Sequence, residues 1–468
     1  MKINRKFLYL AIYCLTGCSN SKTSTASFNE VSCEQSLASL NQSGNLNFLE
    51  GPYWKYFQDP MLDELQDMLC IGNKTLLAEE YHIKTIFDQV TALKGSILPQ
   101  ASFVFQDFFQ YYSRTGVYGS LIKKGLPAYY NDMTTGIGFN WNLDLAGQQK
   151  FYYKSMIEQG ISKLYKLKGM HLDLSALLSK TYFNLKALIN IHKHLKQMLT
   201  LAKEQKALTM NLLTFDLANE QKLIDQEKKI KTLEIKLNIV EYNQNADMAL
   251  LKALVAKMPD EWNPSLSPSL PRELPFVTLE DLKLGLIGQR PDIQMAVHLL
   301  NEASLKIKSA KAAFYPNITL TSLSGFDSVN FSKLFLNQSQ AYTFTPILTL
   351  PIFSAGMLNA NLRKERHQYE SLIHSYDEAL LKAAKEVVSF GSKFITTYNE
   401  FKNSYQIQIL ESHKTVLITD NYNTGLVSKL EALEAMIEDH NKAIERYYFQ
   451  KDFIFSFIDL SSSLGGGL

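Results

Sequence analysis

Two long stretches of this sequence lack the residues that usually end helices. Neither glycine nor proline occurs between Met170 and Met258, and no proline follows Pro351. Because proline removes a backbone donor and glycine is a poor helix former, their absence favours uninterrupted helices. A helix of roughly 60 residues reaches about 90 Å, which exceeds any globular core. Such helices are stable only when they pack on neighbours along their length.

An excess of charge of either sign is also missing. The chain has 48 Lys and Arg residues against 46 Asp and Glu residues, a net charge of +2. A nucleic-acid partner is therefore not indicated, since such proteins concentrate basic residues on one surface. No Walker A sequence, nucleophile elbow, zinc pattern or dinucleotide fingerprint occurs. We expect neither an enzyme nor a resident metal or cofactor.

Cysteine is scarce, and of the four cysteines Cys14 lies within an N-terminal export signal and Cys18 directly follows it. Three of the first six residues are basic, and the apolar segment that follows, up to Leu15, is too short to span a bilayer. Residues 1–17 are therefore predicted to be a signal peptide. Cys33 and Cys70 remain in the mature chain. An oxidising compartment would allow them to pair, but the sequence leaves that pairing open.

The end of the signal, Leu15-Thr16-Gly17-Cys18, resembles the lipobox of bacterial lipoproteins. The resemblance implies cleavage before Cys18, which would then carry an N-acyl and an S-diacylglycerol lipid. Ser19 follows, in place of the Asp that retains lipoproteins at the inner membrane, and this implies the outer membrane. The alternative is an ordinary signal peptide with a chance cysteine. Residues 18–53, rich in Ser, Asn, Thr and Gln up to Gly51, are predicted to be a lipidated tether.

One strand-turn-strand-helix pattern occurs twice. Residues 54–258 form the first predicted repeat and residues 289–468 the second, separated by a proline-rich linker at 259–288. The strand hairpins are expected at about 97–145 and 314–353. Tandem copies that are too thin to bury a core predict side-by-side packing. Oligomerisation would extend the same packing into a ring.

The predicted strands alternate between apolar and polar residues. Between Gly136 and Leu145 one face is apolar, with Ile137, Phe139, Trp141, Leu143 and Leu145. In a bilayer this pattern is typical of a barrel strand with its apolar side outward. Four strands cannot close a barrel, and an open edge in lipid leaves backbone groups unsatisfied at a cost of several kcal/mol each. Several chains must therefore contribute strands, and three would give 12 strands and 12 helices.

Helical periodicity is equally regular. An amphipathic helix is expected from Asp59 to Val90, with Leu62, Leu65 and Leu69 on one face. A 3-4 spacing, typical of a coiled-coil seam with two polar interruptions, runs through eight further residues. These are Ile230, Leu233, Leu237, Val240, Gln244, Asp247, Leu251 and Leu254.

Four motifs, in this order and spacing, resemble the TolC-type outer membrane factors, specifically their NodT-like and OprM-like lipoprotein branch. The motifs are Trp54-Lys55-Tyr56-Phe57-Gln58-Asp59-Pro60-Met61-Leu62, Gln289-Arg290-Pro291-Asp292-Ile293, Ala312-Ala313-Phe314-Tyr315-Pro316 and Leu464-Gly465-Gly466-Gly467. Val297, Lys308 and Leu468 depart from the residues usual in the family. None of these departures touches the architecture.

The resemblance implies a mainly α-helical homotrimer with a transmembrane β part. Its 12-stranded barrel would lie in the outer membrane, in contact with outer membrane lipids, and continue into a coiled-coil tunnel through the periplasm. The tunnel would dock on a periplasmic membrane-fusion adaptor and an inner-membrane pump, most simply of the RND type, to export small molecules.

Three alternatives stay open at this point. One is the outer membrane component of a type I protein secretion system. The others are a periplasmic coiled-coil adaptor lipoprotein and an enzyme on an all-α scaffold.

The resemblance also implies where the channel is gated. The segment from Tyr422 to Ala435 resembles the family segment in which acidic residues ring the tunnel aperture, with Gly425 in the turn. Glu431 and Glu434 are three residues apart and share a helix face. In a trimer they would bring six carboxylates near one axis.

In the first repeat, an offset of 215 residues places Asp216 opposite Glu431 and Met210 where the turn glycine is expected. Because Met210 is not glycine, we expect a different turn geometry there. Val427 stands where some family members carry an Arg that latches the gate, so the latch of this chain is left open.

Overall fold

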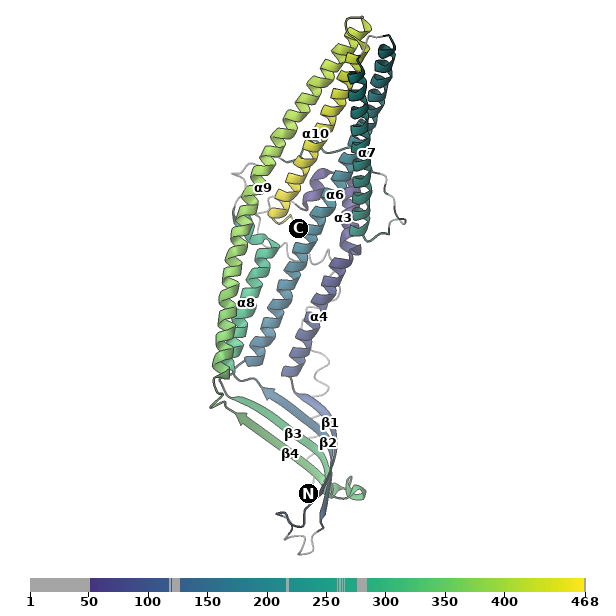
Figure 1. Ribbon diagram of the computed structural model, residues 1–468. Helices are drawn as coiled ribbons and strands as arrows, with labels where there is room; N and C mark the ends of the chain where they lie inside the picture. The colour runs from purple at the N-terminus through teal and green to yellow at the C-terminus, as the bar shows by residue number, and fades with distance from the viewer. Residues whose placement is uncertain are drawn as a thin grey trace. The chain divides into compact units, whose positions relative to one another are not determined.

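The computed structural model describes residues 51–117, 119, 127–215, 219–258, 260, 262, 264, 266–275 and 284–466. In this part, long helices lie side by side and a four-stranded sheet adjoins one end of them (Figure 1). No described helix combines the length and the apolar character needed to cross a bilayer. The predicted signal peptide, Cys18 and most of the predicted tether lie outside the described residues.

The same order of elements occurs twice along the chain. The first set is α4 (Lys74–Ile97), β1 (Gln100–Tyr111), β2 (Tyr129–Leu143), α6 (Gln148–Thr214) and α7 (Glu220–Leu254). The second set is α8 (Pro291–Ala312), β3 (Asn317–Ser328), β4 (Gln340–Thr349), α9 (Met357–Asn423) and α10 (Lys429–Ser463). Helices α6 and α9 have 67 residues each, and α7 and α10 have 35 each. Helices α6 and α7 begin 209 residues before their counterparts, α9 and α10.

The chain enters the helical layer through the short helix η2 (Tyr53–Phe57) and α3 (Pro60–Gly72). The single helix predicted from Asp59 to Val90 is wrong, because the chain breaks at Asn73. The Asn73 side chain accepts hydrogen bonds from the backbone of Thr75 and Leu76 at 3.0 and 3.2 Å and donates one to the Leu254 carbonyl at 2.9 Å. Asn73 therefore caps a new helix, α4, and ties it to the end of α7.

The four strands form one antiparallel sheet in the order β1-β2-β3-β4. Large apolar side chains stand exposed on it, including Phe103, Phe139 and Phe344, at 76%, 45% and 69% exposure. The outer edges of β1 and β4 have no partner strand in the described part of the chain. A sheet with exposed aromatic faces and two unpaired edges is incomplete as a water-soluble unit.

Helix α6 forms the common packing surface of the helical layer. It contacts α4 and α8 in its first part and α7 and α10 in its second part. The predicted seam on α7 is confirmed, since its six apolar residues are all buried. Its polar position Asp247 is only partly buried and accepts a hydrogen bond from the Asn184 amide at 2.6 Å.

The motifs at the two ends of the described chain meet in the middle of the helical layer. The Tyr53 backbone donates to the Gly466 carbonyl at 3.2 Å, and the Tyr53 hydroxyl lies 3.0 Å from the hydroxyls of Ser175 and Ser179. Burial of Tyr53 raises the pKa of its phenol to about 12. The phenol therefore stays neutral and serves as a buried hydrogen-bonding anchor.

A buried ion pair fixes the entry segment to α6. The Asp59 carboxylate lies 2.8 Å from the ammonium of Lys186, whose side chain is only 2% exposed, and accepts a hydrogen bond from the Tyr182 hydroxyl at 2.8 Å. Burial alone would raise the pKa of Asp59, but the hydrogen bonds from Lys186 and Tyr182 and the Lys186 charge outweigh it and lower the pKa. Asp59 is thus held ionised beside a buried cation.

A second cluster joins the start of the second repeat to its neighbours. The Arg290 guanidinium lies 2.8 Å from Asp292 and 2.8 Å from Glu386 on α9, and it donates to the Ser463 carbonyl at the end of α10 at 3.0 Å. The motif around Arg290 therefore has a structural role. It connects α8, α9 and α10.

We predict that Asp59→Asn lowers the free energy of unfolding by roughly 3 kcal/mol, because it leaves the Lys186 charge buried without a partner. Guanidinium unfolding of the detergent-solubilised protein, followed by circular dichroism, measures this change. The control is Asp63→Asn, which removes a partly exposed pair with Lys55 at 2.9 Å and should cost less than about 1 kcal/mol.

The double variant Asp59→Asn/Lys186→Met should recover much of the loss, since it removes both charges.

The pH dependence of stability follows from the lowered pKa of Asp59. Its stabilising contribution is complete above the ordinary Asp pKa and is lost as the pH falls through the lower value of the folded protein. Equal stabilities of Asp59→Asn and Asp63→Asn would contradict this account.

Candidate functional site

The two pairs of long helices turn back at the end away from the sheet, which we call the tip (residues 205–215, 219–229 and 414–438) (Figure 1). Helix α6 ends at Thr214 and α7 begins at Glu220, while α9 ends at Asn423 and α10 begins at Lys429. Helix α6 packs against both α7 and α10. The predicted gate segment of the second repeat therefore lies against the first repeat.

Gly425 lies in the turn between α9 and α10, with a φ of +79°. The Leu426 backbone donates to the Asn421 carbonyl at 2.8 Å, and the Gly425 backbone donates to the Tyr422 carbonyl at 3.0 Å. These two bonds form the Schellman motif that ends many helices, and it requires a left-handed residue at the glycine position. The Gly425 position has open space around it, so only its φ restricts substitution.

Helix α10 begins with a side-chain cap. The Ser428 hydroxyl accepts a hydrogen bond from the Glu431 backbone at 3.2 Å. The Glu431 carboxylate is exposed in the first turn, where the helix dipole favours negative charge. Within the described part of the chain, Glu431 has no ion-pair partner. It is the free carboxylate of the predicted acidic pair.

Glu434, in contrast, is held by the first repeat. Its carboxylate accepts a hydrogen bond from the Gln205 amide at 2.8 Å and lies 3.0 Å from the Lys229 ammonium. Partial burial would raise the pKa of Glu434, but its bonds to Gln205 and Lys229 and the charge of Lys229 outweigh this effect and lower the pKa. Glu434 thus connects α10 to α6 and α7.

Two further ion pairs connect the helices of the tip. Lys429 on α10 lies 2.7 Å from Glu204 on α6, and Lys206 on α6 lies 2.8 Å from Glu227 on α7. The pKa of Lys429 is raised mainly by its hydrogen bond to Glu204 and to a smaller extent by Tyr422. All these pairs are at least partly exposed, so each contributes little to stability and is weakened further by salt. Ion pairs of this kind break readily.

The predicted alignment of the first repeat is wrong in the tip. Because α6 and α7 begin 209 residues before α9 and α10, Asp216 corresponds to Gly425 and not to Glu431. Met210 lies inside α6 and not in the turn, which comes after Thr214. Asp216 itself lies outside the described residues.

Sequence reasoning missed the partners of Glu434. Gln205 is 1% exposed, and it lies 229 residues before the carboxylate that it contacts. Lys229 directly precedes the seam residue Ile230. This position was the one feature of the sequence that indicated contact between Lys229 and a neighbouring helix. No local pattern links either residue to Glu434.

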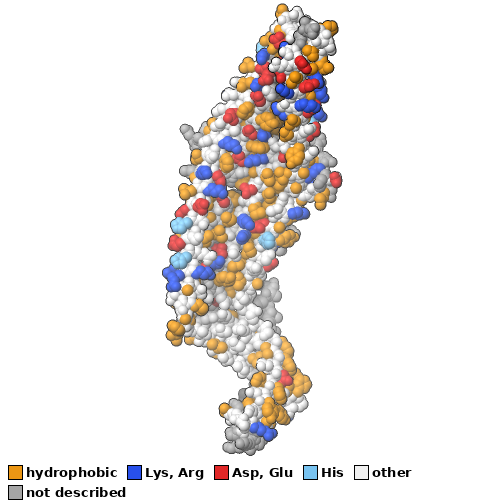
Figure 2. Space-filling view, viewed as in Figure 1, with side chains coloured by type: hydrophobic (Ala, Val, Ile, Leu, Met, Phe, Trp, Pro, Cys, Tyr) orange, Lys and Arg blue, Asp and Glu red, His pale blue; other side chains and the backbone are white. Residues whose placement is uncertain are grey.

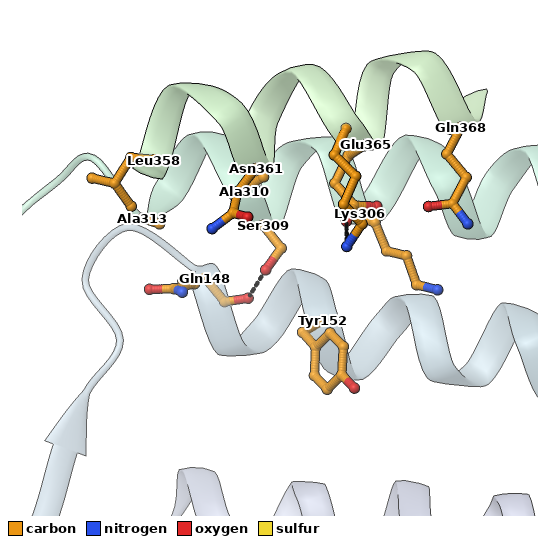
Figure 3. A pocket seen from close by; sticks show the side chains of 11 residues that line it. Gln148, Tyr152, Lys306, Ser309, Ala310, Ala313, Leu358, Asn361, Glu365 and Gln368 are labelled. Carbon is orange, nitrogen blue, oxygen red and sulfur yellow. Dashed lines mark hydrogen bonds and ion pairs between the residues drawn. The ribbon is translucent and has the colours of Figure 1, made fainter. Parts of the chain in front are cut away.

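A pocket of about 500 Å³ lies at the opposite end of the helices, between the starts of α6 and α9 and the end of α8 (Figure 3). Gln148, Tyr152, Lys306, Ser309, Asn361 and Glu365 are among its lining residues. Its two lysines are already paired, Lys306 with Glu302 at 2.7 Å and Lys364 with Glu365 at 3.0 Å. Among the described residues, no group of three or more His, Cys, Asp or Glu is placed to hold a metal ion.

Comparison with known proteins identifies relatives of this chain. A model of the outer membrane efflux protein family matches residues 286–466. The multidrug resistance outer membrane proteins MdtP of Escherichia coli K12 and MdtQ of Escherichia coli O6:H1 are 26% and 25% identical to the chain. The MdtP match covers 97% of this chain and 94% of MdtP, and the MdtQ match covers 99% of both.

The crystal structure of the Campylobacter jejuni CmeC outer membrane channel has the same fold, with a TM-score of 0.78 and 20% identity over 92% of this chain and 91% of CmeC. The family model covers the second repeat, whereas the matches to MdtP, MdtQ and CmeC extend over both repeats. Residues 286–466 match the outer membrane efflux protein family, and the chain as a whole is similar in sequence and fold to outer membrane efflux channels.

Proposed function

We propose that this outer membrane efflux channel works as a homotrimer, in which three four-stranded sheets join into one 12-stranded barrel. The unpaired edges of β1 and β4 carry the proposal, because unsatisfied backbone groups in lipid cost several kcal/mol each. Joining β4 of one chain to β1 of the next satisfies both edges and leaves the exposed aromatic side chains facing lipid. The paired helices of three chains would then continue as a tunnel through the periplasm.

The channel would be the exit duct of a tripartite system, docking on a periplasmic adaptor and an RND-type inner-membrane pump. The multidrug resistance names of MdtP and MdtQ support small-molecule drugs as its cargo. Cys18 would carry the lipid anchor. Transport energy would come from the pump, and this chain would supply the passage.

We place the gate of the duct at the tip, around Glu431, Glu434, Asp216 and Tyr422. The ion pair of Glu434 with Lys229 would hold α10 against α7 in the closed state. Glu431, free of such a pair, would face the aperture. Gly425 would set the direction in which α10 leaves α9.

The first test concerns assembly. The purified protein in detergent should be a stable trimer by light scattering, and deletion of the gene should sensitise cells to drugs that the complemented strain exports. A monomer that inserts into membranes and conducts would contradict the shared barrel.

A second test concerns the aperture. In planar bilayers the wild-type channel should be cation-selective and blocked by divalent cations from the periplasmic side, because like carboxylates near one axis attract and bind cations. Glu431→Ala/Glu434→Ala should weaken the selectivity and remove the block. Unchanged selectivity and block in the double variant would place both acids on a solvated outer face.

A third test concerns the latch. Lys229→Ala should raise the open probability, because it removes the ion pair that joins α7 to α10, and it should increase cation selectivity by freeing Glu434. The matched control is Lys236→Ala, an exposed α7 lysine without an ion pair in the described part of the chain. Identical single-channel records of the two variants would exclude Lys229 from gating.

A further inference from the structure

The helix ends next to the sheet carry an excess of positive charge that the proposed function leaves unused. The ten residues nearest the strands on α4, α6, α8 and α9 contain nine basic and two acidic residues, a net charge of +7. The whole chain has a net charge of only +2. We call the nine residues the basic belt: Lys94, Lys150, Lys154, Lys306, Lys308, Lys311, Arg363, Lys364 and Arg366.

The opposite end of the same helices has no such excess. The ten residues nearest the turns on α6, α7, α9 and α10 contain six basic and seven acidic residues, a net charge of −1. The charge is therefore concentrated at the sheet end. General solubility does not require this asymmetry, since it would be served equally by charge at either end.

Most of the belt is available to a partner. Eight of its nine side chains are exposed, and only Lys306 and Lys364 have ion-pair partners among the described residues. Figure 2 shows basic side chains where the helices approach the sheet, while the sheet itself is mostly apolar or uncharged.

The belt residues also share helix faces. Lys150 and Lys154 on α6 are four apart, and Lys308 and Lys311 on α8 are three apart. Arg363 and Arg366 on α9 are spaced in the same way. Each pair of like charges repels within its own helix, so the arrangement costs stability unless anions gather there.

We infer that the basic belt binds the anionic headgroups of phospholipids in the leaflet beside the helices. The inference rests on the proposed barrel, because only a sheet embedded in lipid brings the belt to the height of the headgroups. Ten helical residues extend about 15 Å, which keeps the whole belt near the interface. Each basic residue close to an anionic bilayer surface strengthens binding by about fivefold.

The test uses the full-length, lipidated protein in nanodiscs of equal phosphatidylglycerol and phosphatidylcholine. After transfer to detergent, native mass spectrometry counts the lipids that stay bound. The wild type should retain phosphatidylglycerol over phosphatidylcholine by about fivefold or more, and about 0.5 M salt should reduce this preference by screening. Lys308→Gln/Lys311→Gln/Arg363→Gln/Arg366→Gln removes four of the nine basic residues and should lower this preference by about fivefold or more.

The control variant removes four exposed lysines of α7 and α9 that lie outside the belt: Lys222→Gln/Lys236→Gln/Lys385→Gln/Lys402→Gln. It should keep the wild-type ratio. A belt variant that retains the preference, or a control variant that loses it equally, would overturn the inference. Conductance of the same wild-type preparation separates the two proposals. Channels without any lipid preference refute the belt alone, whereas the absence of channels refutes the barrel.

Discussion

The structure depends on a requirement set by length. A helix of 67 residues extends about 100 Å, and no single neighbour of ordinary size can cover it. Helix α6 meets this requirement with two successive sets of partners, α4 and α8 near the sheet and α7 and α10 toward the tip. Small buried residues allow close approach in the first part. A side-chain carbon at Gly160, for example, would lie 2.9 Å from the ring of Phe87.

Two groups of buried charges lie where the chain changes direction, although Glu302 on α8 and Lys252 on α7 are buried as well. The Asp59–Lys186 pair and the Arg290 cluster both stand where a connecting segment joins the long helices. Apolar packing along a helix is tolerant of small shifts in register, whereas a buried ion pair requires one arrangement. The tip uses exposed pairs instead, such as Lys229 with Glu434. The strength of polar contacts therefore decreases from the middle of the helices to the tip.

Much of this architecture could be predicted, because it follows from the periodicity of the local sequence. The α7 seam follows a 3-4 spacing, and the alternation of Ile137, Phe139 and Trp141 marks an exposed strand face. The break at Asn73 was missed because apolar periodicity continues on both sides of it, although Gly72 and Asn73 are residues that often end helices. The bond from Asn73 to the end of α7 is not visible in the local sequence.

The errors in the tip have a different cause. A short acidic match between Asp216 and Glu431 suggested an offset of 215, although the glycines that precede α6 and α9, Gly147 and Gly356, are 209 apart. The partners of Glu434 were invisible for a related reason. They come from the other repeat, and contact between distant segments leaves no mark on a single sequence.

The offset of 209 residues has an electrostatic consequence. In the first turn of α7 the charged residues are Glu220 and Lys222, and their counterparts in α10 are Lys429 and Glu431. The two repeats thus carry opposite signs at equivalent positions. In a closed ring of alternating repeats, each acid would have a base as its neighbour on either side. Acidic and basic residues would therefore alternate around the tip of such a ring. The repulsion among its carboxylates would be offset within the ring itself.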